Sequence, residues 1–417
     1  NRIVTMPVGV ENFYIINNDT SGAYTVQLKA ASGSGATVTW ATDDKGWKFV
    51  YFDGVATNTG VFAIGQDLSD LVVNDLTING ELQALGTIKL DGNYPTGTNN
   101  VALGDTALDS VQAGGTNNVA IGDHAGTAIT TGDNNVAVGA CTLSSNTTAV
   151  DNVAIGFCAM RATTTGATNT SIGANTMMEN TTGCLNTVVG AGGLMCNTEG
   201  CQNIVMGGFA MRRNTTGDNN TAIGREALCA NTTADQNTAV GFQSLCSNTT
   251  GINNSAVGSQ TIQANTTGCN NVAMGRLALN TNTEGDENVA VGSCSLRRNT
   301  TGNNNTSLGA CSLMCNTTGT SNAAVGTNAL HVNTTADGNT AVGKSSLAAN
   351  TTGASNTALG SNSLLANTTA GENTALGFRS LCKTTTGCQN TAVGSVTMRQ
   401  NTTGDLNVAV GYRSLDA

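Results

Sequence analysis

The residues of this chain that could serve as acids, bases or nucleophiles are scattered. Six aspartates share one position in a repeated pattern but lie mostly far apart: Asp133, Asp218, Asp235, Asp286, Asp337 and Asp405. Hydrolysis of a glycosidic bond needs two carboxylates at one place, and only Asp218 and Asp235 come from neighbouring repeats. His124 and His331 lie far from each other and fit no catalytic triad. We therefore expect solvated carboxylates, no catalytic residue and no enzyme activity.

Cysteine is the other residue type with chemical potential, and the chain has 13 of them. None forms a Cys-x-x-Cys motif, and they sort into a few fixed positions of the repeat. Pairs such as Cys141/Cys158 and Cys229/Cys246 would stack roughly 4.8 Å apart on adjacent coils. A disulfide there would be strained but feasible. We interpret the cysteines as free thiols and predict no metal site and no cofactor.

A single glycine-centred motif determines the architecture. The glycine of Asn-x-Ala-Val-Gly recurs every 17 residues from Gly122 to Gly411, after one step of 18 residues from Gly104. The Asn four residues before the glycine, from Asn100 to Asn407, is present in all 19 copies. A strict short period with fixed polar and apolar positions predicts a solenoid, in which each repeat is one coil stacked on the next.

The segment 339–353 represents one coil. Alternation along a strand predicts that Thr340 and Val342 point to one side and Ala341 and Gly343 to the other. We expect Ser346-Leu347 to lie in a second short strand, so that Leu347 and Val342 share one apolar ridge. Asn350-Thr351-Thr352-Gly353 should then form the second corner, where glycine tolerates positive φ.

Asparagine fills two positions of the repeat. At the corner, Asn occupies 14 of the 16 positions from residue 146 to residue 401, and Thr163 and Thr384 are the exceptions. Asparagines in register can pass amide hydrogen bonds along a stack. The residues that we expect to build this structural ladder are Asn152, Asn220, Asn237, Asn339, Asn356, Gly343, Val342, Leu347 and Asn350.

The predicted coil is too flat to bury its apolar ridge alone. Two short strands per coil would leave the ridge half exposed in a single chain, and burial against identical chains around an axis would cover it. We therefore expect a homotrimer. At roughly 4.8 Å per coil, the 19 coils would span about 90 Å.

Three zones divide the chain. Residues 1–65 alternate in the manner of strands and predict a small, sandwich-like antiparallel β-domain with its tryptophans in the core. Residues 66–98 carry apolar pairs six residues apart, which suits an intertwined β-helical connector. Residues 99–417 form the β-solenoid shaft of 19 coils. The predicted class is therefore an all-β, 17-residue-repeat parallel β-solenoid (β-roll), trimeric, with a small N-terminal antiparallel β-domain.

Composition excludes several partners. The net charge is −10 and there is no basic tail, so nucleic-acid binding is not expected. No apolar run reaches membrane-spanning length, so membrane insertion is not expected. The chain starts at Asn1 and stops at Ala417 within a repeat, so we expect the native protein to continue beyond both ends.

Recognition could use the exposed, variable positions of the coil. Aromatic side chains occupy the first position after the glycine, or the second in the case of Phe209: Phe157, Phe209, Phe242, Phe378 and Tyr412. They could stack on sugars, although we favour corner packing or trimer contacts. Ice binding would need a flat Thr-x-Thr array, whereas Thr351 and Thr352 are adjacent and point to opposite faces.

The repeat resembles the head repeat of trimeric autotransporter adhesins. The copies that carry the resemblance best are Asn118-Val119-Ala120-Ile121-Gly122 and Asn152-Val153-Ala154-Ile155-Gly156. The resemblance covers residues 99–417 and implies a left-handed parallel β-roll assembled as a trimer. The coil departs from that family by being a few residues longer, and the Asn-Thr-Thr-Gly corner fills the difference.

The front of the chain resembles phage tail fibre proteins instead. Residues 1–54 are similar to a small β-domain of these fibres, and the stretch 71–80 is similar to a connector that precedes their shafts. We therefore expect the structural shaft of a viral (phage) tail fibre that supports host-cell attachment, located in the virion and extracellular. Its partners would be tail or baseplate proteins and a host receptor, either a glycan or an outer-membrane component, bound through a tip outside this chain. The alternatives are the head of a trimeric adhesin on a bacterial cell surface and, as a minor one, an ice-binding solenoid.

Overall fold

The structure is a computed structural model and describes residues 2–6, 11–19, 21–30, 37–42, 46–53, 61–64 and 97–416. Within these residues the chain contains strands and turns but no helix, which confirms the all-β prediction. It divides into two compact units, Asn1–Ile88 and Lys89–Ala417. The predicted connector, residues 66–98, lies outside the described residues except for its last two positions.

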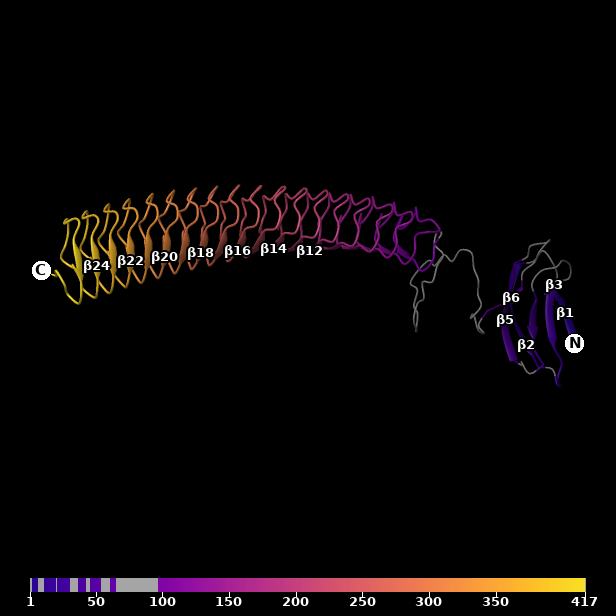
Figure 1. Cartoon of the computed structure of the whole chain (residues 1–417). Helices are drawn as coiled ribbons and strands as arrows, with labels where there is room; N and C mark the ends of the chain where they lie inside the picture. The colour runs from indigo at the N-terminus through magenta and orange to yellow at the C-terminus, as the bar shows by residue number, and fades with distance from the viewer. Residues whose placement is uncertain are drawn as a thin grey trace. The chain divides into compact units, whose positions relative to one another are not determined.

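The first unit contains two three-stranded sheets. The strands are β1 (Arg2–Met6), β2 (Glu11–Asn18), β3 (Val26–Ala30), β4 (Val38–Trp40), β5 (Gly46–Asp53) and β6 (Val61–Ile64). One sheet has the order β1-β3-β4 and the other β2-β5-β6 (Figure 1). The prediction of a wholly antiparallel domain is wrong for one pair, since β1 and β3 are parallel. Because β2 joins the other sheet, no hairpin links β1 to β3.

Apolar side chains of both sheets form one core in this unit. Val26, Leu28, Val38 and Trp40 come from one sheet, and Val50 comes from the other. Trp40 is completely buried, in the position that the sequence predicts for it. The two sheets therefore pack face to face in a sandwich-like manner.

The second unit is a parallel β-solenoid with 19 strands of three residues each. The strands are β7 (Val101–Leu103), β8 (Val119–Ile121), β9 (Val136–Val138), β10 (Val153–Ile155), β11 (Thr170–Ile172), β12 (Thr187–Val189), β13 (Ile204–Met206), β14 (Thr221–Ile223), β15 (Thr238–Val240), β16 (Ser255–Val257), β17 (Val272–Met274), β18 (Val289–Val291), β19 (Thr306–Leu308), β20 (Ala323–Val325), β21 (Thr340–Val342), β22 (Thr357–Leu359), β23 (Thr374–Leu376), β24 (Thr391–Val393) and β25 (Val408–Val410). Each strand from β8 to β24 pairs with the preceding and the following one, and β7 and β25 end the stack (Figure 1).

Strand pairing keeps the repeat in register. In β21, Thr340, Ala341 and Val342 lie opposite Thr357, Ala358 and Leu359 of β22. Residues at the same position of successive coils therefore stack into columns, which we number from the repeat glycine. The predicted 17-residue-repeat parallel β-solenoid is confirmed.

The core lies inside each coil, and this corrects the predicted ridge. Ala341 and Leu347 are completely buried, whereas Val342 is 38% exposed. Strand alternation directs Val342 outward, opposite to Ala341. Val342 and Leu347 therefore do not share one apolar face.

The predicted second strand is also replaced by turns. Ser345 and Leu347 have φ angles of 56° and 50°, in the left-handed region. Two left-handed residues so close together reverse the chain too sharply for a strand and direct Leu347 inward. The backbone N–H of Leu347 donates to the Ser363 carbonyl of the next coil at 3.0 Å. A single coil can thus enclose its own small core.

The repeat glycine packs against the next coil. Gly343 has φ of +132°, and a Cβ there would lie 2.6 Å from the carbonyl of Gly360. Gly338, near the other corner, has φ of +66°, and the nearest atom to a Cβ would be 3.8 Å away. Only the first position therefore requires glycine for both conformation and space.

We expect Gly343→Ala to lower the free energy of unfolding by about 2 kcal/mol or more, because strain and a backbone clash combine. Gly338→Asn is the matched control and should change stability by less than about 0.5 kcal/mol, since Asn tolerates left-handed φ. Thermal unfolding followed by circular dichroism measures both. Equal midpoints for the two variants would contradict the packing argument.

Candidate functional site: ladders and exposed columns of the solenoid

The asparagine column before each strand forms a buried hydrogen-bond ladder. Oδ1 of Asn339 accepts the backbone N–H of Asn356 at 3.0 Å and its Nδ2 group at 3.2 Å. Nδ2 of Asn356 also donates to the Ala370 carbonyl across the corner at 2.8 Å. Both asparagines are completely buried. One amide therefore connects two coils and closes the corner of its own coil.

The other predicted ladder asparagines of this column make the same contact. The backbone N–H groups of Asn152, Asn220 and Asn237 donate to the preceding Oδ1 at 3.1, 2.9 and 2.9 Å. The other predicted ladder residues lie elsewhere. Gly343 lies in the turn, Val342 on the outer face of the sheet, and Leu347 in the core.

Asn350 belongs to a second ladder at the corner. Its Nδ2 donates to Oδ1 of Asn333 at 2.9 Å and to the Gly353 carbonyl at 2.8 Å. The ladder is interrupted at Thr384, whose hydroxyl donates instead to the Asn401 carbonyl. As a result Oδ1 of the preceding Asn367 is buried and has no hydrogen-bond partner within residues 97–416.

Thr384→Asn should repair this ladder. The new Nδ2 group would reach Asn367 Oδ1 and the Gly387 carbonyl, so we expect a gain of about 1 kcal/mol in unfolding free energy. Thr163→Asn is the matched control, since the preceding Asn146 Oδ1 already accepts the Ala149 N–H at 2.9 Å. Thermal unfolding compares the two variants. A gain no larger for Thr384→Asn than for Thr163→Asn would contradict the role of the unpaired oxygen.

The six aspartates of the repeat have a structural role that the sequence reasoning missed. Asp235 Oδ1 accepts the backbone N–H of Asp218 at 2.7 Å, and Asp405 Oδ1 accepts that of Cys388 at 2.6 Å. Asp133, Asp218, Asp286 and Asp337 make the equivalent contact. The carboxylates tie coils together, so they are more than solvated corner residues. Their restriction to one column was the signal that could have revealed this.

The two histidines contact different groups and do not come together. Nδ1 of His124 lies 2.6 Å from the carboxylate of Asp123, and both side chains are at least half exposed. Nδ1 of His331 lies 3.0 Å from the Cys311 carbonyl oxygen. The described part of the chain contains no group of three or more His, Cys, Asp or Glu residues that could hold a metal ion.

Several cysteines stack on adjacent coils as free thiols. The Sγ atoms of Cys184 and Cys201 lie 2.8 Å apart. A hydrogen bond from the Cys246 thiol lowers the pKa of Cys229 to about 7, although burial opposes this shift. The same contact raises the pKa of Cys246. The Cys229 thiol is therefore the more acidic of this pair.

The acidic thiol should be visible in alkylation kinetics. Because the thiolate is the nucleophile, Cys229 should reach half its maximal rate with iodoacetamide near pH 7 and slow as the pH falls below this value. Cys246→Ala removes the donated hydrogen bond, so the profile should move to higher pH. Peptide mapping by mass spectrometry measures the rate at each cysteine, with Cys269 as the internal reference. An unchanged profile in the variant would contradict the assigned cause.

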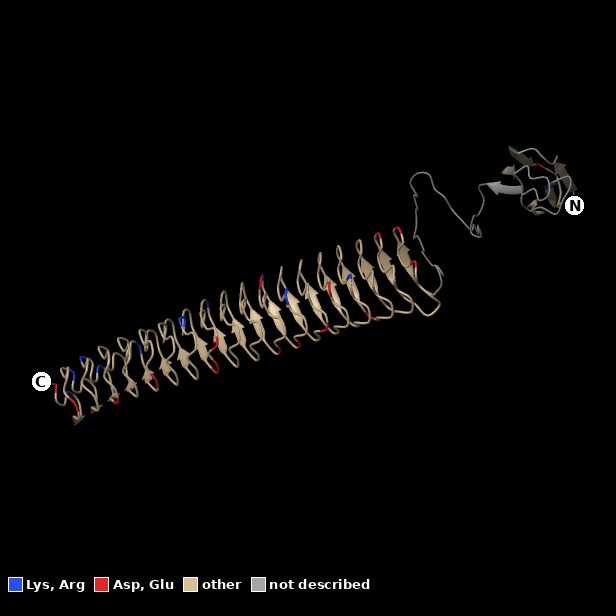
Figure 2. Ribbon diagram, turned by 90° about the horizontal axis from the view of Figure 1, so that it is seen from above, with Lys and Arg blue, Asp and Glu red and all other residues tan. Residues whose placement is uncertain are grey.

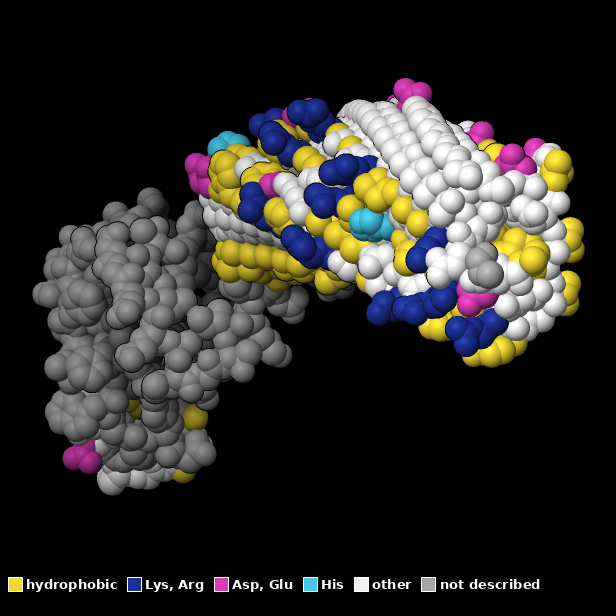
Figure 3. All heavy atoms as spheres, turned by 90° about the vertical axis from the view of Figure 1, so that its left-hand side faces the viewer, with side chains coloured by type: hydrophobic (Ala, Val, Ile, Leu, Met, Phe, Trp, Pro, Cys, Tyr) yellow, Lys and Arg dark blue, Asp and Glu magenta, His cyan; other side chains and the backbone are white. Residues whose placement is uncertain are grey.

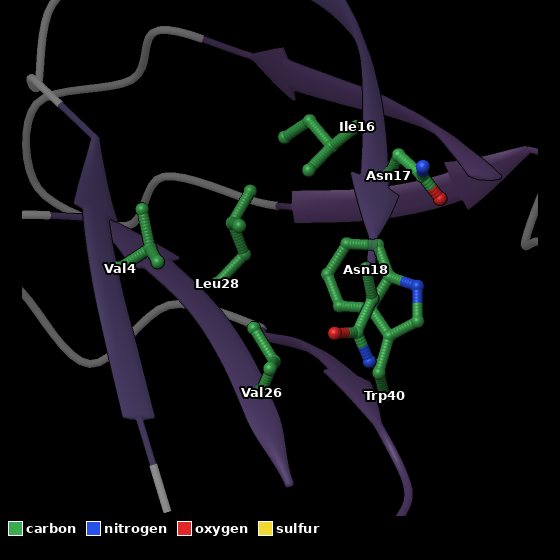
Figure 4. A pocket seen from close by; sticks show the side chains of 7 residues that line it. All are labelled: Val4, Ile16, Asn17, Asn18, Val26, Leu28 and Trp40. Carbon is green, nitrogen blue, oxygen red and sulfur yellow. The ribbon is translucent and has the colours of Figure 1, made fainter. Parts of the chain in front are cut away.

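A pocket of about 250 Å³ lies in the N-terminal unit (Figure 4). It is lined by Val4, Ile16, Asn17, Asn18, Val26, Leu28 and Trp40. Most of these side chains are apolar and belong to the core between the two sheets. The pocket contains no charged side chain among its lining residues and therefore suggests no chemistry.

An apolar column runs along the outer face of the solenoid sheet. It consists of the residue directly before each glycine, and we call it the outer column. Its exposed members have exposed fractions between 36% and 69%: Leu103, Ile121, Ile155, Ile172, Val189, Met206, Ile223, Val257, Met274, Leu308, Val342, Leu359, Leu376 and Val410. Figure 3 shows a band of hydrophobic side chains along the solenoid. A continuous apolar band of this kind is typical of a protein–protein interface.

Comparison of the chain with protein-family models, curated proteins and solved structures found no match. The class that the geometry defines is a parallel β-solenoid repeat protein. No helix that could cross a membrane occurs among the described residues.

Proposed function

We propose that this chain is the structural shaft of a phage tail fibre and assembles as a homotrimer. The shaft supports host-cell attachment and joins tail or baseplate proteins to a receptor-binding tip. The observation that carries the proposal is the outer column, an apolar band on a solenoid whose core is already complete. Such a band serves assembly rather than folding of the single chain.

Mechanical stiffness supports the shaft function. Successive coils are joined by strand pairing and by the Asn339 ladder, and most of them also by the Asn350 ladder and by a threonine column such as Thr351, whose hydroxyl donates to the Thr368 carbonyl at 2.9 Å. At about 4.8 Å per coil, the 19 coils form a segment of about 90 Å. Bending requires several of these in-register contacts to break at once.

The exposed sheet face supports association around a common axis. Homo-oligomers favour closed symmetry, and copies that bring their outer columns together would bury an apolar band over the whole solenoid. The resemblance of the repeat to trimeric adhesin heads favours three copies. The same architecture suits the alternative, the head of a trimeric bacterial adhesin. Ice binding is less favoured because the Thr351 hydroxyl is already hydrogen-bonded.

The mass of the full chain in solution tests the assembly. We expect about three times 42.0 kDa by light scattering. The double variant Leu359→Thr/Leu376→Thr should lower this mass, because it interrupts the outer column. Ile252→Thr is the control, since Ile252 is 40% exposed but lies outside the outer column. A monomeric wild-type chain, or a double variant that stays trimeric, would overturn the proposed interface.

The location of the chain separates the two attachment proteins. For a tail fibre, mass spectrometry should detect the chain in purified virus particles, and antibodies should label fibres outside the capsid. Labelling of the bacterial surface in the absence of virus would instead favour the adhesin.

A further inference from the structure

The cations of the solenoid are confined to one of its two edges. All its lysines and arginines lie within six residues after a repeat glycine, on an edge that we call the basic edge: Arg161, Arg212, Arg213, Arg225, Arg276, Arg297, Arg298, Lys344, Arg379, Lys383, Arg399 and Arg413. The charged residues in the columns nine to twelve residues after the glycine are all acids, and we call these columns the acidic edge: Asp133, Asp151, Glu199, Asp218, Asp235, Glu284, Asp286, Glu287, Asp337, Glu372 and Asp405. Six further acids share the columns of the basic edge: Asp105, Asp109, Asp123, Glu179, Glu226 and Asp416. Figure 2 shows the two edges on opposite sides of the solenoid.

The two edges differ in how far their charges are satisfied within the chain. Six carboxylates of the acidic edge accept backbone N–H groups of neighbouring coils. On the basic edge only Arg225, Arg399 and Arg413 form ion pairs within residues 97–416. The acidic edge thus has a structural role, whereas most cations of the basic edge remain available to an external anion.

Exposed aromatic side chains accompany these cations. Phe157, Phe209, Phe242, Phe378 and Tyr412 are 42% to 73% exposed. The guanidinium carbon of Arg212 lies 5.7 Å from the Phe209 ring centre, and that of Arg379 lies 5.3 Å from the Phe378 ring centre. Figure 3 shows basic and hydrophobic side chains interleaved on one side of the solenoid. Much of each ring is therefore accessible to a ligand.

We propose that the basic edge binds an acidic polysaccharide that lies along the solenoid. The apolar faces of sugar rings pack on the exposed aromatic rings. Sulfate or carboxylate groups of the same polysaccharide pair with the guanidinium groups of the protein, which present two parallel N–H donors. The inference goes beyond the shaft function, because binding requires only the solenoid and no separate tip.

The spacing of the cations favours a polysaccharide over a nucleic acid. From Gly156 onward, 12 cations are distributed over 16 coils, which at about 4.8 Å per coil gives one positive charge per 6 to 7 Å, approximately. A nucleic-acid strand carries a phosphate about every 3.4 Å, roughly twice this density. One charge per sugar or per disaccharide matches the basic edge better.

The segment from Phe209 to Phe242 contains the densest group of aromatic rings and cations in the interior of the solenoid. Arg212 and Arg213 follow Phe209 in one coil, and Arg225 of the next coil lies with its guanidinium carbon 6.0 Å from the Phe242 ring centre. Two aromatic rings and three cations thus lie within three successive coils, a length of about 10 Å, and of these cations Arg225 is already paired with Glu226 whereas Arg212 and Arg213 form no ion pair within residues 97–416. This group is the place to test the proposal.

The test measures binding of the full chain to dextran sulfate by isothermal titration calorimetry at about 0.15 M salt, where long-range screening is strong. Neutral dextran, poly-glutamate and a single-stranded oligonucleotide are the comparison probes. We expect dextran sulfate to bind the wild type most tightly. Arg212→Gln/Arg213→Gln and Phe209→Ala/Phe242→Ala should each weaken this binding at least about fivefold.

Two controls match these variants. Lys344→Gln removes an isolated cation of the basic edge, and Ile252→Ala removes an exposed apolar side chain of the acidic edge. Both should change the affinity less than about twofold. Circular dichroism verifies that all variants keep their β-structure, which is expected because the substituted side chains are exposed.

Three results would overturn the proposal. Equal binding of poly-glutamate, with no loss in Phe209→Ala/Phe242→Ala, would reduce the interaction to non-specific electrostatics. Tighter binding of the oligonucleotide would assign the edge to nucleic acid. A lower mass of Arg212→Gln/Arg213→Gln in light scattering would make the basic edge a contact between copies. None of these results bears on the outer column, so the shaft proposal is tested separately.

Discussion

The buried asparagine amide is the group on which the rest of the solenoid depends. A coil without long strands leaves many backbone groups at its corners that no strand partner can reach, and a buried unpaired group costs about 1–3 kcal/mol. The Asn339 and Asn350 columns supply donors and acceptors at the same corner, where Asn356 and Asn367 both donate to the Ala370 carbonyl. Because each amide also contacts the equivalent amide of the neighbouring coil, the requirement repeats identically along the stack. This explains why the period is strict while the exposed positions vary.

A narrow core follows from this use of the corners. Ala341 and Leu347 are the main apolar side chains that a coil buries, and Leu347 is reached only through a left-handed backbone. Such a conformation costs an ordinary residue about 1–2 kcal/mol, which side-chain burial and the hydrogen bond to Ser363 offset. The second coil shows how this narrow core is filled when the buried Leu or Met is missing. Gly126 replaces the usual Leu or Met there, and Ile129 fills the space beside Leu108.

The period of the repeat made the architecture predictable, whereas the local backbone conformation within a coil could not be predicted. The fixed Asn and Gly columns predict a solenoid in register without knowledge of any contact. The inward direction of Leu347 could not be predicted, because no sequence pattern marks a leucine for positive φ, and strand alternation therefore suggested a shared ridge with Val342. The parallel pairing of β1 with β3 was equally hidden, since it depends on which sheet the intervening β2 joins. The aspartates share one column that is visible in the sequence, but the backbone N–H of the preceding coil that each carboxylate accepts is not.

A solenoid of this kind separates folding from recognition. The inward positions and the corner asparagines are fixed by backbone hydrogen bonding, so selection can act on the exposed columns without disturbing the coil. Because the coils are in register, a side chain that suits a periodic ligand recurs at multiples of one coil rise, about 4.8 Å. Weak contacts then add along the rod by raising the effective concentration of each next contact. The arrangement permits the observed distribution of charge, with six carboxylates of one edge bonded to the backbone of neighbouring coils and all the cations of the solenoid on the other edge.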